Sequence, residues 1–141
     1  MPVDGGEPVR ITKRPSTFPA ISPDGRWIAC NYLPEHAGPD GWRLAIVAAD
    51  GSGAARVLDA PGPPTRRLAW TPDGRHVVFA EQRKSAGVLL RLRADGEEPA
   101  EELARFDDAR IAAFRWSVDG RRVAVVVSRE LSNLVVIEDF R

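Results

Sequence analysis

A short pattern occurs three times in this chain and strongly limits what it can fold into. Each copy has an apolar residue or run, a tight turn containing Asp-Gly-Arg, and a second apolar run. The copies begin Ile21-Ser22-Pro23-Asp24-Gly25-Arg26, Trp70-Thr71-Pro72-Asp73-Gly74-Arg75 and Trp116-Ser117-Val118-Asp119-Gly120-Arg121. A second set of Asp-Gly pairs begins at Asp4, Asp50 and Asp95. Two interleaved turns that recur at one interval, about 45–50 residues, indicate a repeat built from hairpins.

The residues of these turns have separate structural tasks. The aspartate bonds nearby backbone amides, and the glycine accepts a positive φ angle. We therefore assign a structural role to Asp24, Gly25, Asp73, Gly74, Asp119 and Gly120. A catalytic acid is needed once per site, so threefold repetition favours the turn role over catalysis. A ring of these carboxylates around a cation is the less favoured alternative.

Each repeat is predicted to contain four strands, A to D, because branched and aromatic residues fill the segments between turns. In the first repeat we expect strands at residues 18–22, 27–33, 42–48 and 55–58. In the second repeat we expect them at 67–71, 76–81, 88–93 and 103–106. The third repeat supplies only strands A, B and C, at 113–117, 122–128 and 133–140. Residues 98–105 contain Ala, Glu and Leu and favour a helix locally, but the repeat register favours a strand.

At this point the residues carry a resemblance to a family. Ser22-Pro23-Asp24-Gly25-Arg26-Trp27-Ile28-Ala29 and its two later versions resemble the repeat of TolB-type, WD40-like (PD40) bacterial β-propellers. The opening stretch, residues 3–12, is similar to the C-to-D hairpin of that repeat, so the resemblance covers nearly the whole chain. Val118 departs from the family's turn proline. The resemblance implies an all-β propeller, and propellers of the family commonly have six or more blades.

The repeats define a single half-propeller over residues 1–141. Residues 15–62 form the first blade, 63–108 the second, and 109–141 strands A to C of the third, while residues 1–14 supply a spare strand D. Three blades are fewer than the roughly 4–8 that close a ring. Because two-fold symmetry is the commonest in homo-oligomers, we expect a homodimer that forms one six-bladed propeller. The expected dimer seam pairs Val9, Arg10, Ile11 and Thr12 of one copy with Leu134, Val135, Val136 and Ile137 of the other.

An alternative is that the chain is a fragment of a longer propeller, since it begins inside a repeat. Such a fragment would have the same open ends.

Composition and charge exclude several classes of function. Lys plus Arg number 20, as do Asp plus Glu, so the formal net charge is zero. No global field draws the chain to nucleic acid, and no apolar run approaches the roughly 20 residues of a membrane span. The start of the chain has no signal-peptide pattern. The compartment stays undecided, since the resemblance allows a periplasmic or a cytoplasmic protein.

The chain shows no catalytic or metal-binding motif. His36 falls in a loop and His76 begins a strand, and no paired cysteine or HExxH motif accompanies them. Neither a G-x-S-x-G elbow nor a triad is present. Gly51-Ser52-Gly53 is a hairpin turn and not a phosphate loop, because too few residues follow for the required helix. Cys30 is expected to be a buried, unreactive thiol. We therefore expect no enzyme activity, no metal and no cofactor.

The remaining candidates are aromatic and basic residues. Trp70 and Trp116 occupy equivalent positions in strand A and should pack between blades, and Trp27 and Trp42 are the other aromatic anchors. The basic pairs Lys13-Arg14 and Arg66-Arg67 fall just before or between blades and are candidates for lining a binding face. Arg121-Arg122 is a third basic pair.

Three functions follow from these features. The first is a non-enzymatic scaffold that binds another protein, or a small ligand at the mouth of the channel. The second is a sensor or regulatory propeller belonging to a larger bacterial kinase, peptidase or transcriptional regulator. The third is an enzyme or ligand binder that uses the channel of the assembled ring.

Overall fold

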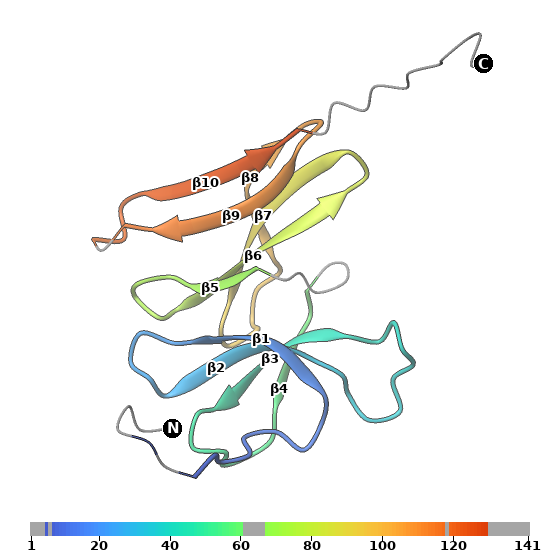
Figure 1. The fold of residues 1–141 in the computed structure, drawn as a ribbon, viewed down its shortest axis with the longest axis vertical. Coiled ribbons are helices and arrows are strands. Elements are labelled where there is room, and N and C mark those ends of the chain that lie inside the picture. Colours follow the sequence, from blue (N-terminus) through green and yellow to red (C-terminus); the bar gives the residue numbers. More distant parts are fainter. Residues whose placement is uncertain (1–4, 6, 61–66, 118, 130–141) are drawn as a thin grey trace, which may run out of the picture.

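The computed structural model describes residues 5, 7–60, 67–117 and 119–129, and these residues form ten strands and no helix. Within each of the three sheets, strands that follow one another in sequence pair antiparallel (Figure 1). The first sheet contains β1 (Ser16–Ile21), β2 (Trp27–Tyr32), β3 (Arg43–Ala48) and β4 (Arg56–Leu58). The second contains β5 (Leu68–Trp70), β6 (His76–Arg83), β7 (Ala86–Arg93) and β8 (Glu101–Phe106). The third contains β9 (Arg110–Trp116) and β10 (Val123–Ser128).

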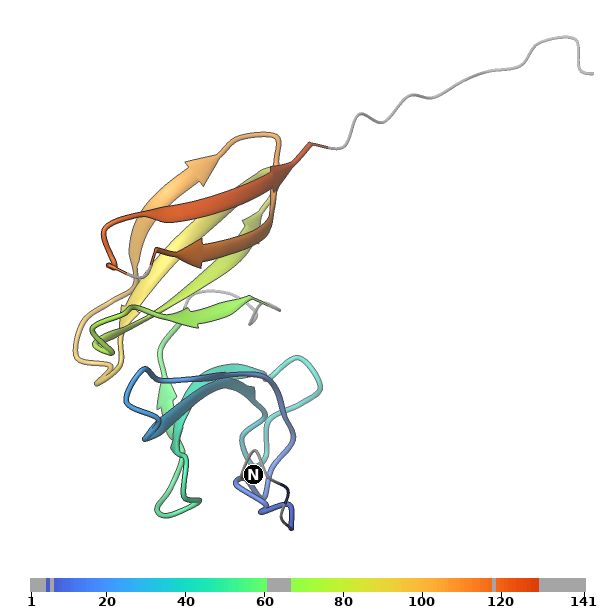
Figure 2. The ribbon, with the colours of Figure 1, turned by 60° about the vertical axis from the view of Figure 1, so that its left-hand side comes forward.

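The sheets stack face to face in chain order, so the second lies between the first and the third (Figures 1 and 2). The first two sheets are four-stranded meanders, and the third is a hairpin within the described residues. The Asp-Gly turns set the register of the strands that they join, and Trp70, for example, pairs with Val77 across the turn at Asp73. Four-stranded antiparallel meanders stacked in this way are the blades of a β-propeller. We call them blades one, two and three.

Two apolar clusters join the blades. The cluster between blades one and two includes Leu44, Leu58 and Trp70, and the cluster between blades two and three includes Leu89, Ile111 and Phe114. Because side chains alternate along a strand, blade two sends one face into each cluster. Val77 and Phe79 of β6 belong to the first cluster, whereas Val78 between them belongs to the second. Blade two is therefore packed on both faces.

The strands predicted for the first two repeats and strands A and B of the third are confirmed, with ends that differ by a few residues. Residues 101–106 form β8, so the helical alternative there is wrong. Pairing with β7 satisfies the backbone of this segment, which local propensity alone does not decide. The predicted third strand C, 133–140, lies outside the described residues, as does the blade boundary at 62 and 63.

Residues 7–15, the continuous part of the amino-terminal segment that the structure describes, form no strand. Arg10 instead closes a local turn by donating from Nε to the Thr12 carbonyl oxygen at 2.9 Å. This segment lies beside blade one, because a Cβ placed on Gly51 would be 3.7 Å from the Arg10 carbonyl oxygen. The strand predicted at residues 9–12 needs a free sheet edge from another chain, so its pairing stays a prediction.

Candidate functional site

The three Asp-Gly turns have the same hydrogen bonds. In the first, the Ser22 hydroxyl donates to Asp24 Oδ1 at 2.6 Å, and the Arg26 backbone N–H donates to the same oxygen at 3.1 Å. The other turns repeat this pattern with Asp73, which accepts from Thr71 and the Arg75 amide, and Asp119, which accepts from Ser117 and the Arg121 amide. The glycines have φ angles of 71°, 68° and 69° in chain order. These residues close the hairpins, as the repeat predicts.

The same bonds control the ionisation of the turn carboxyls. A hydrogen bond from Ser22, followed by one from the Arg26 amide, lowers the pKa of Asp24. The pKa values of Asp73 and Asp119 are lowered in the same way, by Thr71 and Ser117 respectively. Both donors favour the charged form of the carboxyl, because an ionised oxygen is the stronger acceptor.

We expect these turns to make the fold sensitive to acid. A carboxyl whose folded pKa lies below its ordinary value of 3.8 stabilises the fold at higher pH, and this contribution is lost as pH falls from 3.8 through the folded value. The melting temperature should therefore fall steeply below about pH 4. Replacing Asp24, Asp73 and Asp119 together by Asn keeps an acceptor oxygen at each turn. In that triple variant the melting temperature should fall less steeply as the pH decreases. An unchanged dependence of the melting temperature on pH would contradict this account.

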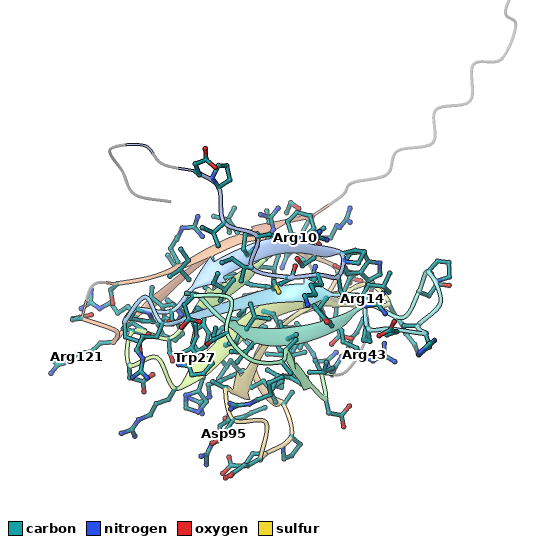
Figure 3. The ribbon with its side chains drawn as sticks, turned by 90° about the horizontal axis from the view of Figure 1, so that it is seen from below. Arg10, Arg14, Trp27, Arg43, Asp95 and Arg121 are labelled. Atoms are coloured by element: carbon teal, nitrogen blue, oxygen red, sulfur yellow. The ribbon has the colours of Figure 1, made fainter. Side chains whose placement is uncertain are left out.

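The turns of neighbouring blades touch one another. A Cβ placed on Gly74 would lie 3.7 Å from Pro23 Cδ, and one on Gly120 would lie 3.2 Å from Pro72 Cγ. The C-to-D turns at Asp50-Gly51 and Asp95-Gly96 lie at the same end of the blades, since each strand reverses direction. We call this end of the molecule the turn face. Figure 3 shows Trp27, Asp95 and Arg121 on this side and Arg14 and Arg43 on the opposite one.

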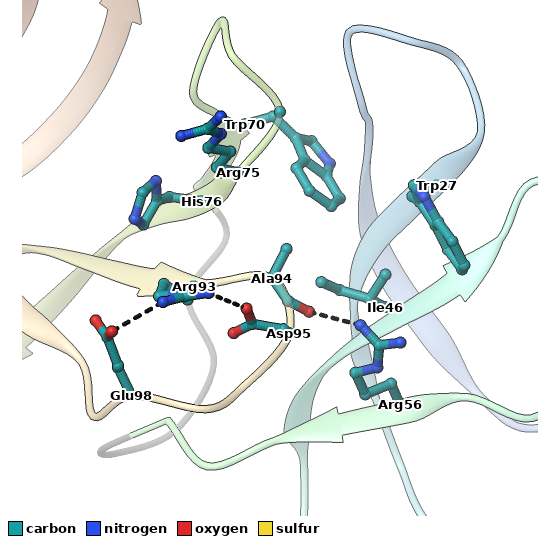
Figure 4. Close-up of a pocket in the computed structure, with 11 residues that line it drawn as sticks. Trp27, Ile46, Arg56, Trp70, Arg75, His76, Arg93, Ala94, Asp95 and Glu98 are labelled. Carbon is teal, nitrogen blue, oxygen red and sulfur yellow. Dashed lines mark hydrogen bonds and ion pairs between the residues drawn. The ribbon is translucent and has the colours of Figure 1, made fainter.

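A cavity of about 530 Å³ opens between blades one and two at the turn face. Trp27 and Trp70 come from opposite blades, and Figure 4 shows Ile46 and Ala94 beneath them. Trp70 is only 7% exposed, and its Nε1 donates to the Ala20 carbonyl oxygen of blade one at 2.8 Å. The apolar part of the cavity is therefore held in place by a hydrogen bond between the blades.

The rim of the cavity carries charged side chains from both blades. Arg93 donates to Glu98 at 2.8 Å and pairs with Asp95, so its charge is compensated (Figure 4). Arg56 of β4 donates from Nη1 to the Ala94 carbonyl oxygen at 3.1 Å. The Arg56 guanidinium also lies 6.0 Å from the centre of the Trp27 ring, within reach of a cation–π interaction.

Arg75 and His76 complete the rim on the blade-two side. The Arg75 side chain is exposed and forms no hydrogen bond or ion pair within the described ranges, although its charge helps to lower the pKa of Asp73. His76 is half-buried at the start of β6. Arg75 therefore presents unused N–H donors at the mouth of an aromatic cavity.

The other candidates from the sequence lie elsewhere. Arg14 pairs with Glu35 at 2.7 Å, away from the turn face. Arg67 is exposed, and its neighbour Arg66 lies outside the described residues. His36 is exposed in its loop with a φ angle of 63°. Cys30 is buried as predicted, and burial raises the pKa of its thiol.

The tryptophan predictions hold in part. Trp70 packs between blades as expected, and Trp116 packs, half-buried, against the cluster between blades two and three. The buried indole nitrogen of Trp116 has no partner among the described residues, unlike that of Trp70.

The described residues contain no group of three or more His, Cys, Asp or Glu side chains arranged to hold a metal ion. In the same residues, no helix is long and apolar enough to cross a membrane.

The structure leaves the predicted dimer seam untested. Val9 is 71% exposed and Ile11 and Thr12 are half-buried at the side of blade one. Their expected partners lie outside the described residues, namely Leu134, Val135, Val136 and Ile137.

The stacked meanders and repeated Asp-Gly turns define a β-propeller type of protein. Residues 5–140 match the family model described as the lipoprotein LpqB beta-propeller domain, and the chain belongs to that family. Its fold is similar to a solved structure of putative TolB from Agrobacterium tumefaciens, with a TM-score of 0.73 at 24% sequence identity. That match covers 92% of this chain but only 44% of the other. A comparison with curated proteins found no match.

Sequence reasoning missed the cavity, although it singled out several of its residues for other reasons. It named Trp27, Trp70, His76 and the turn residues Gly74 and Asp95, but not Arg56 or Arg93. One signal in the sequence could have pointed to the cavity. Arg75 directly follows an Asp-Gly turn that comes just after the interblade tryptophan Trp70.

Proposed function

We propose that this chain is a non-enzymatic β-propeller scaffold whose ring is completed by a second copy. The observation that carries the proposal is apolar exposure at both ends of the row of blades. Ile21 of blade one is 67% exposed, and Val126 of blade three is 57% exposed. Exposed apolar residues on open sheet faces favour association.

Comparison of the repeats indicates that Ile21 lacks a neighbouring blade to cover it. Ile21 occupies the position that Trp70 occupies in blade two, where Trp70 is buried against blade one. No preceding blade covers Ile21 among the described residues. In the proposed ring, the third blade of the second copy covers it, and Val126 lies on the face that blade three turns outward.

The proposed ring also uses the amino-terminal segment. Val9 to Thr12 would leave the side of blade one and pair with the last blade of the other copy. The move would break the local hydrogen bonds of Arg10 and Thr12, which join them to each other and to Lys13, Arg14 and Ser16. Pairing in a sheet would replace them with backbone hydrogen bonds.

Light scattering after gel filtration tests the assembly. At micromolar concentration we expect a mass twice that of the 15.4 kDa chain, without higher multiples. The midpoint of thermal unfolding should then rise with protein concentration, because association stabilises only the folded state. A monodisperse single chain with a concentration-independent midpoint would contradict the two-chain ring.

A second candidate is a sensor or regulatory propeller within a larger bacterial protein. It is supported by the coverage of the TolB chain, which leaves more than half of that chain unmatched, and by the family description, which names a domain of a lipoprotein. In this case the further blades come from the same polypeptide. Expression of the chain with its neighbouring coding sequence would then give one polypeptide whose mass matches a single copy.

A further inference from the structure

The cavity between blades one and two combines two features that a peptide ligand would use. Its interior is aromatic and apolar, formed by Trp27, Trp70 and Ile46. Its rim carries Arg75, whose five N–H donors have no described partner, and Arg56, which uses Nη1 on a backbone carbonyl. A volume of about 530 Å³ lies within the usual range for ligand sites.

The charges on the rim favour an anion. Three arginines and two carboxylates line the cavity, and both carboxylates bind Arg93. Arg56 and Arg75 therefore retain most of their donor capacity, on opposite sides of the opening. Arginine binds carboxylates through paired, charge-assisted hydrogen bonds.

We propose that this cavity binds an acidic peptide segment of a partner protein. An aromatic or aliphatic side chain of the segment enters between Trp27 and Trp70, and a neighbouring carboxylate binds Arg75, with Arg56 as a second anchor. The inference rests on the proposed scaffold role and names the chemistry of its partner. The cavity is built by two complete blades of one chain, so binding does not require the two-chain ring.

Indole N–H signals in proton–nitrogen correlation spectra provide the test. The chain has four tryptophans, so Trp42 and Trp116, which do not line the cavity, serve as internal references. The probe is an end-blocked peptide with one phenylalanine between Glu and Asp residues, titrated into the full chain. We expect the Trp27 and Trp70 signals to shift and saturate while the Trp42 and Trp116 signals stay in place.

Two altered probes separate the contributions of charge and apolar contact. Replacing Glu and Asp in the peptide by Gln and Asn, or Phe by Gly, should each weaken binding at least roughly tenfold. Inorganic phosphate is the third probe. If phosphate shifts the same two signals as strongly as the peptide does, the site is a simple anion site and the peptide assignment fails.

Arg75→Gln is the decisive variant because its side chain supports no other described contact. It should weaken peptide binding roughly tenfold and leave the spectrum of the free protein otherwise unchanged. Arg43→Gln is the matched control, an exposed arginine on the side opposite the turn face (Figure 3), and should bind as the parent does. Equal binding by both variants, or shifts confined to Trp42 or Trp116, would overturn the proposal. The light-scattering measurement of mass tests the two-chain ring, and its outcome does not depend on the outcome of this titration.

Discussion

Replacing Trp70 by alanine is expected to destabilise the chain by about 3–5 kcal/mol, the range for a large aromatic residue removed from a core. Trp70 is 7% exposed, packs in the cluster between blades one and two, and donates a side-chain hydrogen bond that links its blade to β1. Its loss leaves a void and removes the hydrogen bond to the Ala20 carbonyl oxygen. The midpoint of urea unfolding, followed by circular dichroism, should fall accordingly.

Two further variants keep this prediction testable if the alanine protein does not fold. Trp70→Phe retains most of the apolar contact and loses the hydrogen bond, so it should cost about 1 kcal/mol. Trp42→Ala is the control, because Trp42 is half-buried and belongs to neither cluster. If Trp70→Ala were no more destabilising than Trp42→Ala, Trp70 would not join the blades.

Placing a charge at Ile21 should abolish assembly. In the proposed ring Ile21 is buried against the third blade of the second copy, and an arginine there would be desolvated without a partner. An unpaired charge in an interface costs enough to weaken association roughly a hundredfold. Gel filtration with light scattering should therefore find Ile21→Arg as a single 15.4 kDa chain at concentrations where the parent is doubled.

Gln82→Arg provides the matched control for added charge. Gln82 is exposed on β6 of the middle blade, away from both open faces. It should leave the mass unchanged. A doubled mass for Ile21→Arg would place the interface elsewhere. A single-chain mass for both variants would mean that an added positive charge prevents assembly wherever it is placed, and would contradict a specific role of Ile21.

The strands could be predicted because their turns are local chemistry. Asp73 and Gly74 close a hairpin through bonds within a few residues, so sequence spacing alone fixes where β5 ends and β6 begins. The same spacing decided residues 101–106 in favour of a strand, against their local propensity.

The cavity could not be predicted in this way because its walls are not local. Trp27 and Arg56 reach it from blade one, and Arg93 from blade two, across the interface that Trp70 fixes. Which side chains meet there depends on how one blade is rotated against the next. Repeat spacing carries no information on that rotation. It also could not show that Arg10 and Thr12 form a local turn in the isolated chain.

The contact between Pro23 and Gly74, and between Pro72 and Gly120, has a consequence for how such a molecule can diversify. Turns that touch their neighbours tolerate no added residue, since lengthening one displaces the next. At the opposite end the connections already differ in length between blades: residues 33–42 connect β2 to β3, but only Lys84 and Ser85 connect β6 to β7. Insertions should therefore accumulate at that end during evolution, while the turn face keeps a fixed geometry and changes only through its side chains.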